Sequence, residues 1–435
     1  MTLKFGTDGV RAVALTELTT EYVTRLGFAA AQVLGGERWL VARDSRESGP
    51  ELEEALRAGL HLLGGAVVCT VGVVPTPALA LLSALLHEPA AMITASHNPW
   101  QDNGVKLFAA GGQKLTDAEQ DAVEHAMHHL GLPVMSQVVT STANGADVYV
   151  RHMVDTNEPL VGLRVVLDCA NGAMSAVAPE VFRTLGAEVT VIHAEPDGRN
   201  INDHCGATHT ESLQAAVVAA GAQLGLAFDG DGDRVIAVDH LGRVVDGDRL
   251  IALAALQLQE QGTLHHDTVV VTVMSNLGFH RAMEAAGIHV VTTAVGDRYV
   301  LEALDAGGFS VGGEQSGHII YRDLATTGDG LLAGLRLAAF VHGHHRSLAD
   351  LAAEVMTSYP QVLVNVKVAE RHPQVADELA AEVAAAEAAL EGEGRVLLRA
   401  SGTEPLIRVM VEAATDDVAH RVAGDLADIV RARWA

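Results

Sequence analysis

The sequence predicts an α/β protein of several domains, with helices on both faces of mainly parallel sheets. Apolar segments of strand character alternate with helical segments along most of the chain, and this order is typical of β-α-β units. The 435 residues are too many for one hydrophobic core, whereas a hydrophobic fraction of 49% suffices for several cores. We therefore expect two to four domains.

The alternation divides into four units, which we place at residues 1–148, 149–248, 249–358 and 359–435. The first three share the same order of strands and helices, so they are predicted to be similar α/β domains. The last has more hairpin character, with a helix expected over 373–390, and is predicted to be a smaller α+β domain.

In the first unit, the strand "RWLVARDS" leads into a helix over 50–64, and a second helix is expected over 77–86. The strand "AAMITAS" then ends at Ser96, before an Asn-Pro turn. Loops after the carboxyl ends of such strands collect functional residues. Ser96 is therefore a turn residue or a nucleophile, and this stretch alone leaves both open. The unit ends in the polar residues 140–148, as expected of a domain boundary.

The formal net charge of -26 argues against nucleic acid and anionic membranes as partners, because both require clustered cations. Cys69, Cys169 and Cys205 have no CxxC spacing, so we expect free thiols in a reducing compartment. No apolar run approaches the length that spans a bilayer, and no secretory signal precedes the motif that begins at Lys4. These features predict a cytoplasmic protein.

A loop of alternating aspartates and glycines, "DGDGDR", lies between the apolar segments "LGLAF" and "VIAVD". Alternate residues of an extended segment share a face, so the carboxylates of Asp229, Asp231 and Asp233 can converge. Packed carboxylates repel one another unless a cation lies among them, and oxygen ligands suit a magnesium-like ion. The alternative is a solvated acidic turn, but the strict spacing between buried strands favours the metal site.

The loop "GGEQSGH", residues 312–318, places polar side chains on a glycine-rich turn after a strand. Glu314 can accept hydrogen bonds from sugar hydroxyl groups, and Ser316 can donate or accept them. A plain hairpin turn explains the loop equally well when it is taken alone. Sugar binding is one of two interpretations that the loop leaves open.

The loop "RASGTEPLIR" carries groups that suit a phosphate. Arg399, Ser401, Thr403 and the backbone amides around Gly402 can form an anion nest, to which Arg408 returns on the next strand. The alternative is a β-turn with exposed arginines. Hydroxyl groups flanking a glycine between two arginines favour phosphate binding.

A chain this acidic needs local positive charge wherever an anionic substrate binds. A serine, a nearby acidic metal site and a phosphate clamp together fit phosphoryl transfer, which depends on charge neutralisation and in-line positioning. The cations that fall in or beside glycine-rich loops are Arg11, Lys106, Arg234, Arg298, Arg399 and Arg408.

The motifs "TASHNP", "DGDGDR", "GEQSGH" and "RASGTEP" together resemble those of the α-D-phosphohexomutase superfamily, in the same order and over nearly the whole chain. Within it, "FGTDGVR", "LDCANGA" and "CGATH" are similar to the branch of bacterial phosphoglucosamine mutases. Gln315 favours that branch, because phosphomannomutase/phosphoglucomutase relatives tend to carry Met there. Thr210 stands where the branch usually has Pro, and this difference lies in a structural turn. The resemblance implies three similar domains with mixed sheets and a smaller fourth, around a central cleft.

The resemblance also implies the chemistry. Ser96 would be a phosphoserine that converts glucosamine 6-phosphate into glucosamine 1-phosphate through a 1,6-bisphosphate, for amino-sugar and cell-wall precursors. One Mg²⁺ per chain would be held by Ser96 and the three aspartates, and glucosamine or glucose 1,6-bisphosphate would act as an activator. The four domains would carry the phosphoserine, the metal, the sugar site and the phosphate site in turn. Relatives in the branch are often homodimers.

Individual roles follow from the same resemblance. Lys106 is assigned as general acid/base, and His97 as a residue that positions the phosphate. Arg11 and Arg234 would steady the transferring phosphoryl group. Arg298 and His318 would contact the substrate or frame its loop. The remaining substrate-binding residues would be Glu314 and Ser316 for the sugar, and Arg399, Ser401, Gly402, Thr403 and Arg408 for the phosphate.

Three rival functions stay open on the sequence. A phosphomannomutase/phosphoglucomutase would use the same residues on other sugars. A non-catalytic phosphosugar sensor would need no phosphate donor, so the presence of Ser96, Lys106 and the three aspartates argues against it. A metal-dependent serine phosphatase would release inorganic phosphate, which a mutase conserves.

Overall fold

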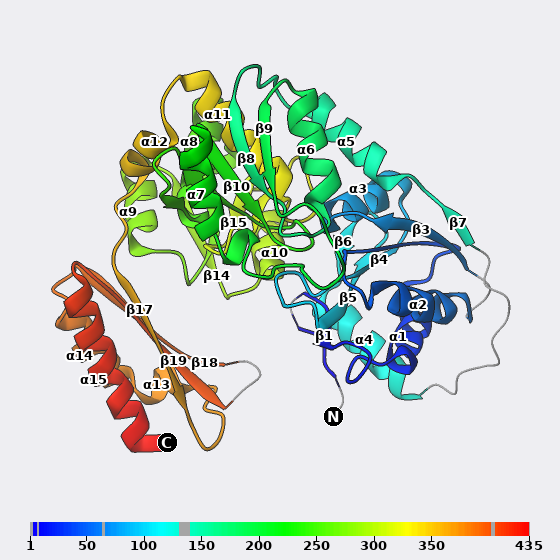
Figure 1. Cartoon of the computed structure of the whole chain (residues 1–435). Helices are drawn as coiled ribbons and strands as arrows, with labels where there is room; N and C mark the ends of the chain where they lie inside the picture. Colours follow the sequence, from blue (N-terminus) through cyan, green and yellow to red (C-terminus); the bar gives the residue numbers. More distant parts are fainter. Residues whose placement is uncertain (1–2, 7, 63–65, 130–139, 402–404, 435) are drawn as a thin grey trace. The chain divides into compact units, whose positions relative to one another are not determined.

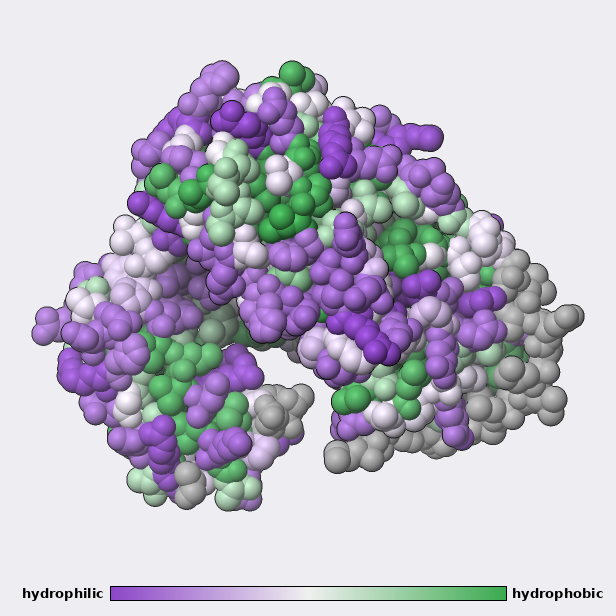
Figure 2. Space-filling view, viewed as in Figure 1, coloured by the Kyte–Doolittle hydropathy of each residue, from purple (hydrophilic) through white to green (hydrophobic). Residues whose placement is uncertain are grey.

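The computed structural model of the chain consists of strands and helices in alternation, as the sequence predicts (Figure 1). None of the described helices combines the length and hydrophobicity that a membrane-crossing segment requires. Figure 2 shows a mainly hydrophilic face with hydrophobic residues in separate patches, in keeping with the net charge of -26. The structure describes residues 3–6, 8–62, 66–129, 140–401 and 405–434.

The chain divides into two compact units. The first comprises Met1–Met274 and Ile288–Ala353 and contains three of the four sheets. The second comprises Ser275–Gly287 and Glu354–Ala435 and contains the fourth sheet. Helix α9 (Leu277–Ala285) therefore belongs to the second unit, although its neighbours along the chain are strands of the third sheet.

The first sheet is mixed. Its parallel strands are β4, β2, β3 and β7, whereas β5 runs antiparallel to both β4 and β1, and β6 pairs with β5. The two helices expected after its strands are present as α2 (Gly49–Leu62) and α3 (Thr76–Leu86), beside α1 (Thr20–Leu34) and α4 (Asp117–His129). The spatial order is β1 (Val10–Val13), β5 (Asp102–Ala109), β4 (Ala90–Ile93), β2 (Arg38–Arg43), β3 (Val67–Val73) and β7 (Thr140–Thr142), with β6 at Gln113–Lys114.

The polar residues 140–148 contain regular structure. They hold strand β7 and the beginning of helix α5 (Gly145–Thr156). Asn144 caps this helix by accepting a hydrogen bond of 3.3 Å from the amide of Asp147. Part of the polar character that suggested a domain boundary therefore belongs to a helix cap, for which Asn is a preferred residue.

The second sheet combines a parallel core with a hairpin. β8 is parallel to both β9 and β10, while β10 and β11 form an antiparallel pair joined by the aspartate-rich loop. Helices α6 (Met174–Thr184) and α7 (Glu211–Ala220) accompany this sheet. The spatial order is β12 (Val244–Val245), β11 (Val235–Asp239), β10 (Leu224–Phe228), β8 (Arg164–Asp168) and β9 (Glu188–Ile192).

The third sheet repeats this plan. β13 is parallel to β14 and β15, and β15 turns back into the antiparallel β16 through residues 314–318. Its order is β14 (His289–Thr293), β13 (Thr268–Thr272), β15 (Val311–Gly313) and β16 (Ile319–Tyr321). Helix α8 (Gly247–Glu260) precedes these strands, and α10 (Asp297–Gly307) lies between β14 and β15. Helices α11 (Gly330–His344) and α12 (Leu348–Val355) follow β16.

The sheet of the second unit is antiparallel throughout, as its hairpin character predicts. Its order is β17 (Gln361–Lys367), β19 (Leu406–Ala413) and β18 (Gly394–Ala400), with α15 (Asp416–Trp434) packed against it. The helix expected over 373–390 forms as α13 (Val375–Glu378) and α14 (Ala380–Ala388), separated by the fully buried Leu379. Three mixed α/β layers and one smaller α+β domain make up the architecture.

Candidate active site

Ser96 lies in the loop between β4 and β5, where its hydroxyl faces the acidic loop of the second sheet. Its Oγ donates a hydrogen bond of 2.6 Å to Oδ2 of Asp229. Its backbone has a φ of 52°, in the left-handed region that costs a non-glycine residue about 1–2 kcal/mol. The Ser96 amide donates to Oγ1 of Thr94 at 2.8 Å. The strained turn therefore aims the hydroxyl at the acidic loop.

Two side chains that the sequence reading missed hold this turn in place. Arg46 is fully buried beside Asp44 and donates hydrogen bonds of 2.9 and 2.8 Å to the carbonyl oxygens of Ser96 and Asn98. The side-chain amide of Asn202 donates to the same two carbonyl oxygens, at 2.9 and 3.0 Å. Residues from two different sheets thus fix the position of the serine.

The aspartates of the loop between β10 and β11 converge, as predicted. One carboxylate oxygen from each of Asp229, Asp231 and Asp233 lies within 4.8 Å of the other two, and all three residues are buried. Oδ1 of Asp231 and Oδ1 of Asp233 have no hydrogen-bond partner. Gly230 permits the close approach, because a Cβ there would lie 2.6 Å from the Ser96 carbonyl oxygen.

The electrostatics of this cluster suit a cation. Burial, together with the charges of Asp233 and Asp231, raises the pKa of Asp229 to about 8. Unpaired buried carboxylate oxygens are costly, and a hard divalent ion is the partner that satisfies several of them at once. The residues present therefore fit a metal of the magnesium type.

Lys106 extends from β5 into the same cluster. Its Nζ lies 2.8 Å from Asp231, 2.8 Å from Asp233 and 2.7 Å from Asp8. Burial alone would lower the pKa of Lys106, but these carboxylates raise it well above its usual value. The ammonium group therefore carries its proton in this arrangement.

His97 stands beside the serine as a neutral imidazole. Its Nδ1 lies 3.3 Å from Oγ of Ser96. Burial, assisted by the positive charges of Arg234 and Arg11, lowers the pKa of His97 to about 4. The neutral ring can thus form a hydrogen bond with an oxygen on Ser96 without adding a charge to the site.

A hollow of about 380 Å³, lined by both basic and acidic side chains, lies beside this centre. Arg11, Arg234 and Glu314 line it, from the N-terminal segment, the acidic loop and the β15–β16 loop. Oε1 of Glu314 accepts a hydrogen bond of 3.1 Å from the amide of Gly296. The hollow is large enough for a small polar molecule and offers both positive charge and a hydroxyl-binding carboxylate.

The other predicted residues of the first unit lie in different settings. His318 is buried between Asp233, 3.6 Å from its Nδ1, and Asp297, 3.3 Å from its Nε2. Arg298 is buried as well and forms an ion pair with Asp117. Ser316 is exposed at the tip of its loop. His318 and Arg298 are thus held by acidic side chains of neighbouring segments.

Three further residues complete the polar network, and the sequence analysis did not identify them as site residues. They are Asp8, Lys114 and Thr76. Asp8 accepts hydrogen bonds from Arg11 at 2.5 Å and from Lys114 at 2.9 Å, and these cations with Lys106 lower its pKa despite its burial. Oγ1 of Thr76, the first residue of α3, donates to Oδ2 of Asp231 at 2.6 Å. Asp8 stands in "FGTDGVR" beside Arg11, a signal that could have identified it.

The second unit contains two opposed arginines. Arg399 on β18 and Arg408 on β19 are cross-strand partners. Burial and the charge of Arg408 lower the pKa of Arg399. Like charges placed opposite each other are unfavourable unless an anion lies with them. Ser401 is buried beyond the end of β18, whereas Gly402 and Thr403 lie outside the described residues.

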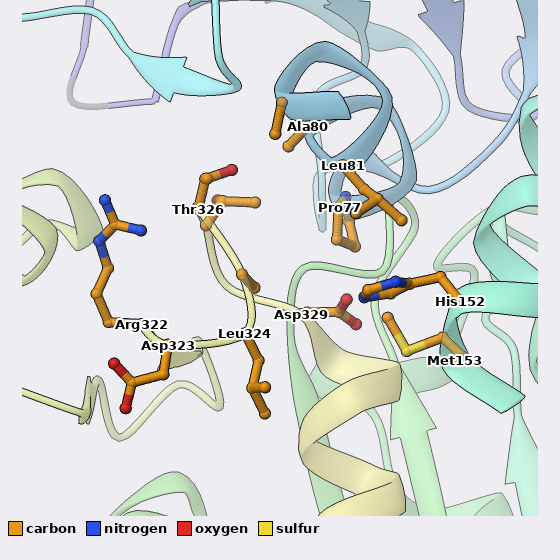
Figure 3. A pocket seen from close by; sticks show the side chains of 13 residues that line it. Pro77, Ala80, Leu81, His152, Met153, Arg322, Asp323, Leu324, Thr326 and Asp329 are labelled. Carbon is orange, nitrogen blue, oxygen red and sulfur yellow. The ribbon is translucent and has the colours of Figure 1, made fainter. Parts of the chain in front are cut away.

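A further hollow, of about 200 Å³, lies among α3, α5 and the segment before α11 (Figure 3). Pro77, Leu81 and Met153 give it apolar walls, and Asp329 reaches it from the segment at the beginning of α11. No predicted site residue lines this hollow. Neither Ser96 nor an aspartate of the acidic loop lines it, so the hollow beside Arg11 is the candidate substrate site.

The site combines a buried carboxylate cluster, a serine hydroxyl at its edge and a hollow that contains Arg11 and Arg234. This combination is typical of a phosphoryl-transfer enzyme. Comparison with known proteins gives the same class. The four phosphoglucomutase/phosphomannomutase family models match in order: alpha/beta/alpha domain I at residues 2–132, domain II at 147–242, domain III at 246–359 and the C-terminal domain at 363–429. The chain therefore belongs to the phosphoglucomutase/phosphomannomutase family and is a phosphohexomutase.

Several curated relatives are similar over their full length. The chain is 54% identical to a phosphoglucosamine mutase of Saccharopolyspora erythraea, over 99% of this chain and 100% of the relative. It is 51% identical to a phosphoglucosamine mutase of Rhodococcus erythropolis, over 98% of both. Among solved structures, a phosphoglucomutase/phosphomannomutase family protein of Burkholderia thailandensis aligns with a TM-score of 0.81 at 25% identity, over 98% of this chain and 97% of that one.

Proposed function

We propose that this chain is a phosphoglucosamine mutase that interconverts glucosamine 6-phosphate and glucosamine 1-phosphate. The observation that carries the proposal is the hydrogen bond from Ser96 to Asp229, which joins a serine to the acidic cluster. The curated relatives and Gln315 in the β15–β16 loop support glucosamine as the sugar.

The reaction begins with Ser96 in its phosphorylated form. The 1-hydroxyl of glucosamine 6-phosphate attacks the phosphorus, a P–O bond forms, and the bond from phosphorus to Oγ of Ser96 breaks. Lys106 gives its proton to the departing serine oxygen and regains one from the sugar hydroxyl, so atoms and charge balance. The acid half of this role requires a proton on Nζ of Lys106, which the neighbouring carboxylates keep there.

The second half of the reaction runs in the opposite sense. The 1,6-bisphosphate turns over within the site and transfers its 6-phosphoryl group to Ser96, which leaves glucosamine 1-phosphate. Arg11 and Arg234 neutralise the transferring group, and neutral His97 hydrogen-bonds to it. Glu314 and Ser316 bind hydroxyl groups near the middle of the ring, which lie similarly in both orientations.

The arginines of the second unit bind the phosphate that is not being transferred. Arg399 and Arg408 can share one phosphate, which removes the repulsion between them. Ser401, with Gly402 and Thr403, would add hydrogen bonds to the same group. This clamp must accept either end of the sugar, because the substrate and the product present different phosphates to it.

Asp229, Asp231 and Asp233, with an oxygen on Ser96, would hold one Mg²⁺. When bound, this ion supplies a positive charge that withdraws electrons from the transferring phosphoryl group. Glucosamine or glucose 1,6-bisphosphate would load Ser96 at the start. A homodimer, a cytoplasmic location and the domain limits 1–148, 149–248, 249–358 and 359–435 are part of the same proposal.

The decisive experiment uses the full chain with Ser96 phosphorylated, which intact mass and peptide mapping establish. Phosphorus NMR should show glucosamine 6-phosphate converted into glucosamine 1-phosphate with little inorganic phosphate. Glucose 6-phosphate and mannose 6-phosphate should turn over more slowly. Release of inorganic phosphate as the main product would indicate a phosphatase, and preference for another sugar would overturn the glucosamine assignment.

A further inference from the structure

A cluster of possible metal ligands lies at one end of the second sheet. It is formed by Asp168, His193 and Cys205, which come from three separate segments. β8 and β9 are parallel neighbours that pair Asp168 with Ile192, so Asp168 and His193 stand at adjacent strand ends. Cys205 reaches them from the segment before α7. One ligand-type atom of each side chain lies within 4.8 Å of the other two.

This cluster is buried and incompletely paired. Asp168 and Cys205 have no exposed surface, and His193 keeps 31% of its side chain exposed. Nδ1 of His193 is buried and lies 3.1 Å from Oδ2 of Asp168, yet it has no aligned hydrogen-bond partner. Buried polar nitrogens are normally satisfied, and a cation between this nitrogen and the carboxylate would satisfy both.

We propose that Asp168, His193 and Cys205 bind one divalent cation of the zinc class, with a fourth position open to water. Nitrogen and sulfur ligands select Zn²⁺ or Co²⁺, whereas the all-oxygen set of the aspartate loop suits Mg²⁺. Three protein ligands with one open position are a known zinc arrangement. His193 also lines a hollow of about 830 Å³, which gives the ion and its water a route to the cluster.

The charges balance with and without the ion. A thiol shielded from solvent, as that of Cys205 is, keeps its proton in the metal-free protein. Zn²⁺ displaces that proton to solvent and faces a thiolate, a carboxylate and a neutral imidazole, which together cancel its charge. A proton that His193 shares with Asp168 in the metal-free protein is released to solvent in the same step.

The backbone aims these side chains and connects them to the reaction centre. Ala170 and His193 have φ values of 52° and 48°, in a region that persists only where the surroundings enforce it. The Asp168 carboxylate accepts hydrogen bonds of 3.0 Å from the amides of Ala170 and Gly206. The segment that leads to Cys205 also carries Asn202, which holds the carbonyl oxygen of Ser96. A bound ion would brace this segment.

The test uses the full chain, treated with a chelator and then supplied with Mg²⁺ to occupy the aspartate loop. Titration with CoCl₂ should give one equivalent of an ion with thiolate-to-cobalt charge-transfer absorption, and ZnCl₂ should displace it. Zn²⁺ should also raise the Tm, because a ligand that binds the folded state stabilises it.

Variants assign the ligands. Cys205→Ser should lose the charge-transfer band and weaken Zn²⁺ binding at least about 10-fold, since even the partners of zinc ligands contribute roughly 10- to 100-fold. His193→Asn should weaken binding similarly while it keeps the fold, because Asn tolerates a left-handed φ. Cys69→Ser, which removes a buried thiol in β3, is the control and should bind as the unmodified chain does. The absence of a thiolate band, or the same band in Cys205→Ser, would overturn the proposal and leave an Asp168–His193 ion pair only.

Discussion

The hydroxyl of Ser96 donates a hydrogen bond of 2.6 Å to the carboxylate of Asp229, a residue 133 positions further along the chain. The contact joins the loop after β4 to the loop after β10, so strand ends of two different sheets meet there. It places the serine oxygen at the edge of the acidic cluster, and the following predictions depend on this placement.

Removal of the Ser96 hydroxyl should abolish turnover and leave the fold intact. We expect Ser96→Ala to lower kcat by about a thousandfold or more, because the phosphoryl acceptor is lost. Binding of glucosamine 6-phosphate should persist, since the arginines and Glu314 remain. Steady-state kinetics and calorimetry measure both quantities, and near-normal turnover by the variant would contradict the role of Ser96.

Ser96→Gly is the matched comparison for this variant. It also lacks the hydroxyl and should be equally inactive. Glycine accepts the φ of 52° without strain, so Ser96→Gly should be more stable than Ser96→Ala by about 1 kcal/mol. Denaturant unfolding measures this difference. Equal stability would show that the left-handed turn is absent in solution.

Asp231→Asn should impair the use of magnesium. Oδ1 of Asp231 is one of the unpaired oxygens of the cluster, and an amide is a weaker ligand for a hard cation. The Mg²⁺ concentration for half-maximal activity should rise at least about 10-fold. Asp239→Asn is the control, because Asp239 is buried at the end of the neighbouring strand and its Oδ1 accepts hydrogen bonds from the Leu241 and Arg243 amides. An activity of the unmodified chain that does not depend on added metal would refute the metal site.

The parts of the site that the sequence predicted are short motifs whose members act together. The carboxylates of Asp229, Asp231 and Asp233 converge because alternate residues of one short loop can point to the same side. The strand-helix alternation likewise predicted most elements of the first unit, since each strand carries its own apolar run. Local spacing and local patterning were sufficient in both cases.

The missed residues act through partners that are distant in sequence. Asn202 holds the Ser96 carbonyl oxygen from another sheet, and Arg46 does so from 50 positions away. Neither contact leaves a local pattern, because only the fold brings the partners together. The same reason explains why the sequence did not show that α9 belongs to the second unit. In sequence α9 lies between strands of the third sheet, but Asn276, which precedes it, forms hydrogen bonds with Tyr359.

Arg399→Ala should weaken phosphosugar binding without destabilising the second unit. A charge-assisted contact to phosphate contributes about 1.5–3 kcal/mol, so the Kd for glucosamine 6-phosphate should rise roughly 10- to 100-fold. The free protein should keep or gain stability, because Arg399 and Arg408 oppose each other across β18 and β19. Lys367→Ala, which removes an exposed cation on β17, is the control. Unchanged affinity by calorimetry would remove Arg399 from the site.

Asp329 should make the stability of the protein depend on pH. This residue is buried and caps α11 (Figure 3). Its Oδ1 accepts hydrogen bonds of 2.8 Å from the Tyr149 hydroxyl and 2.9 Å from the Leu332 amide. Burial raises its pKa from 3.8 to about 6. Below about pH 4 the group is protonated in both the folded and the unfolded chain, so it has no effect there. From about pH 4 to 6 the unfolded chain releases the proton first, so stability falls as the pH rises.

Asp329→Asn isolates this effect, because the amide oxygen can keep both hydrogen bonds but does not ionise. The free energy of unfolding of the variant, relative to that of the unmodified chain, should increase between pH 4 and 6 and then stay constant. Denaturant unfolding at several pH values measures the difference. A difference independent of pH would mean that Asp329 is already ionised in the folded protein at pH 4.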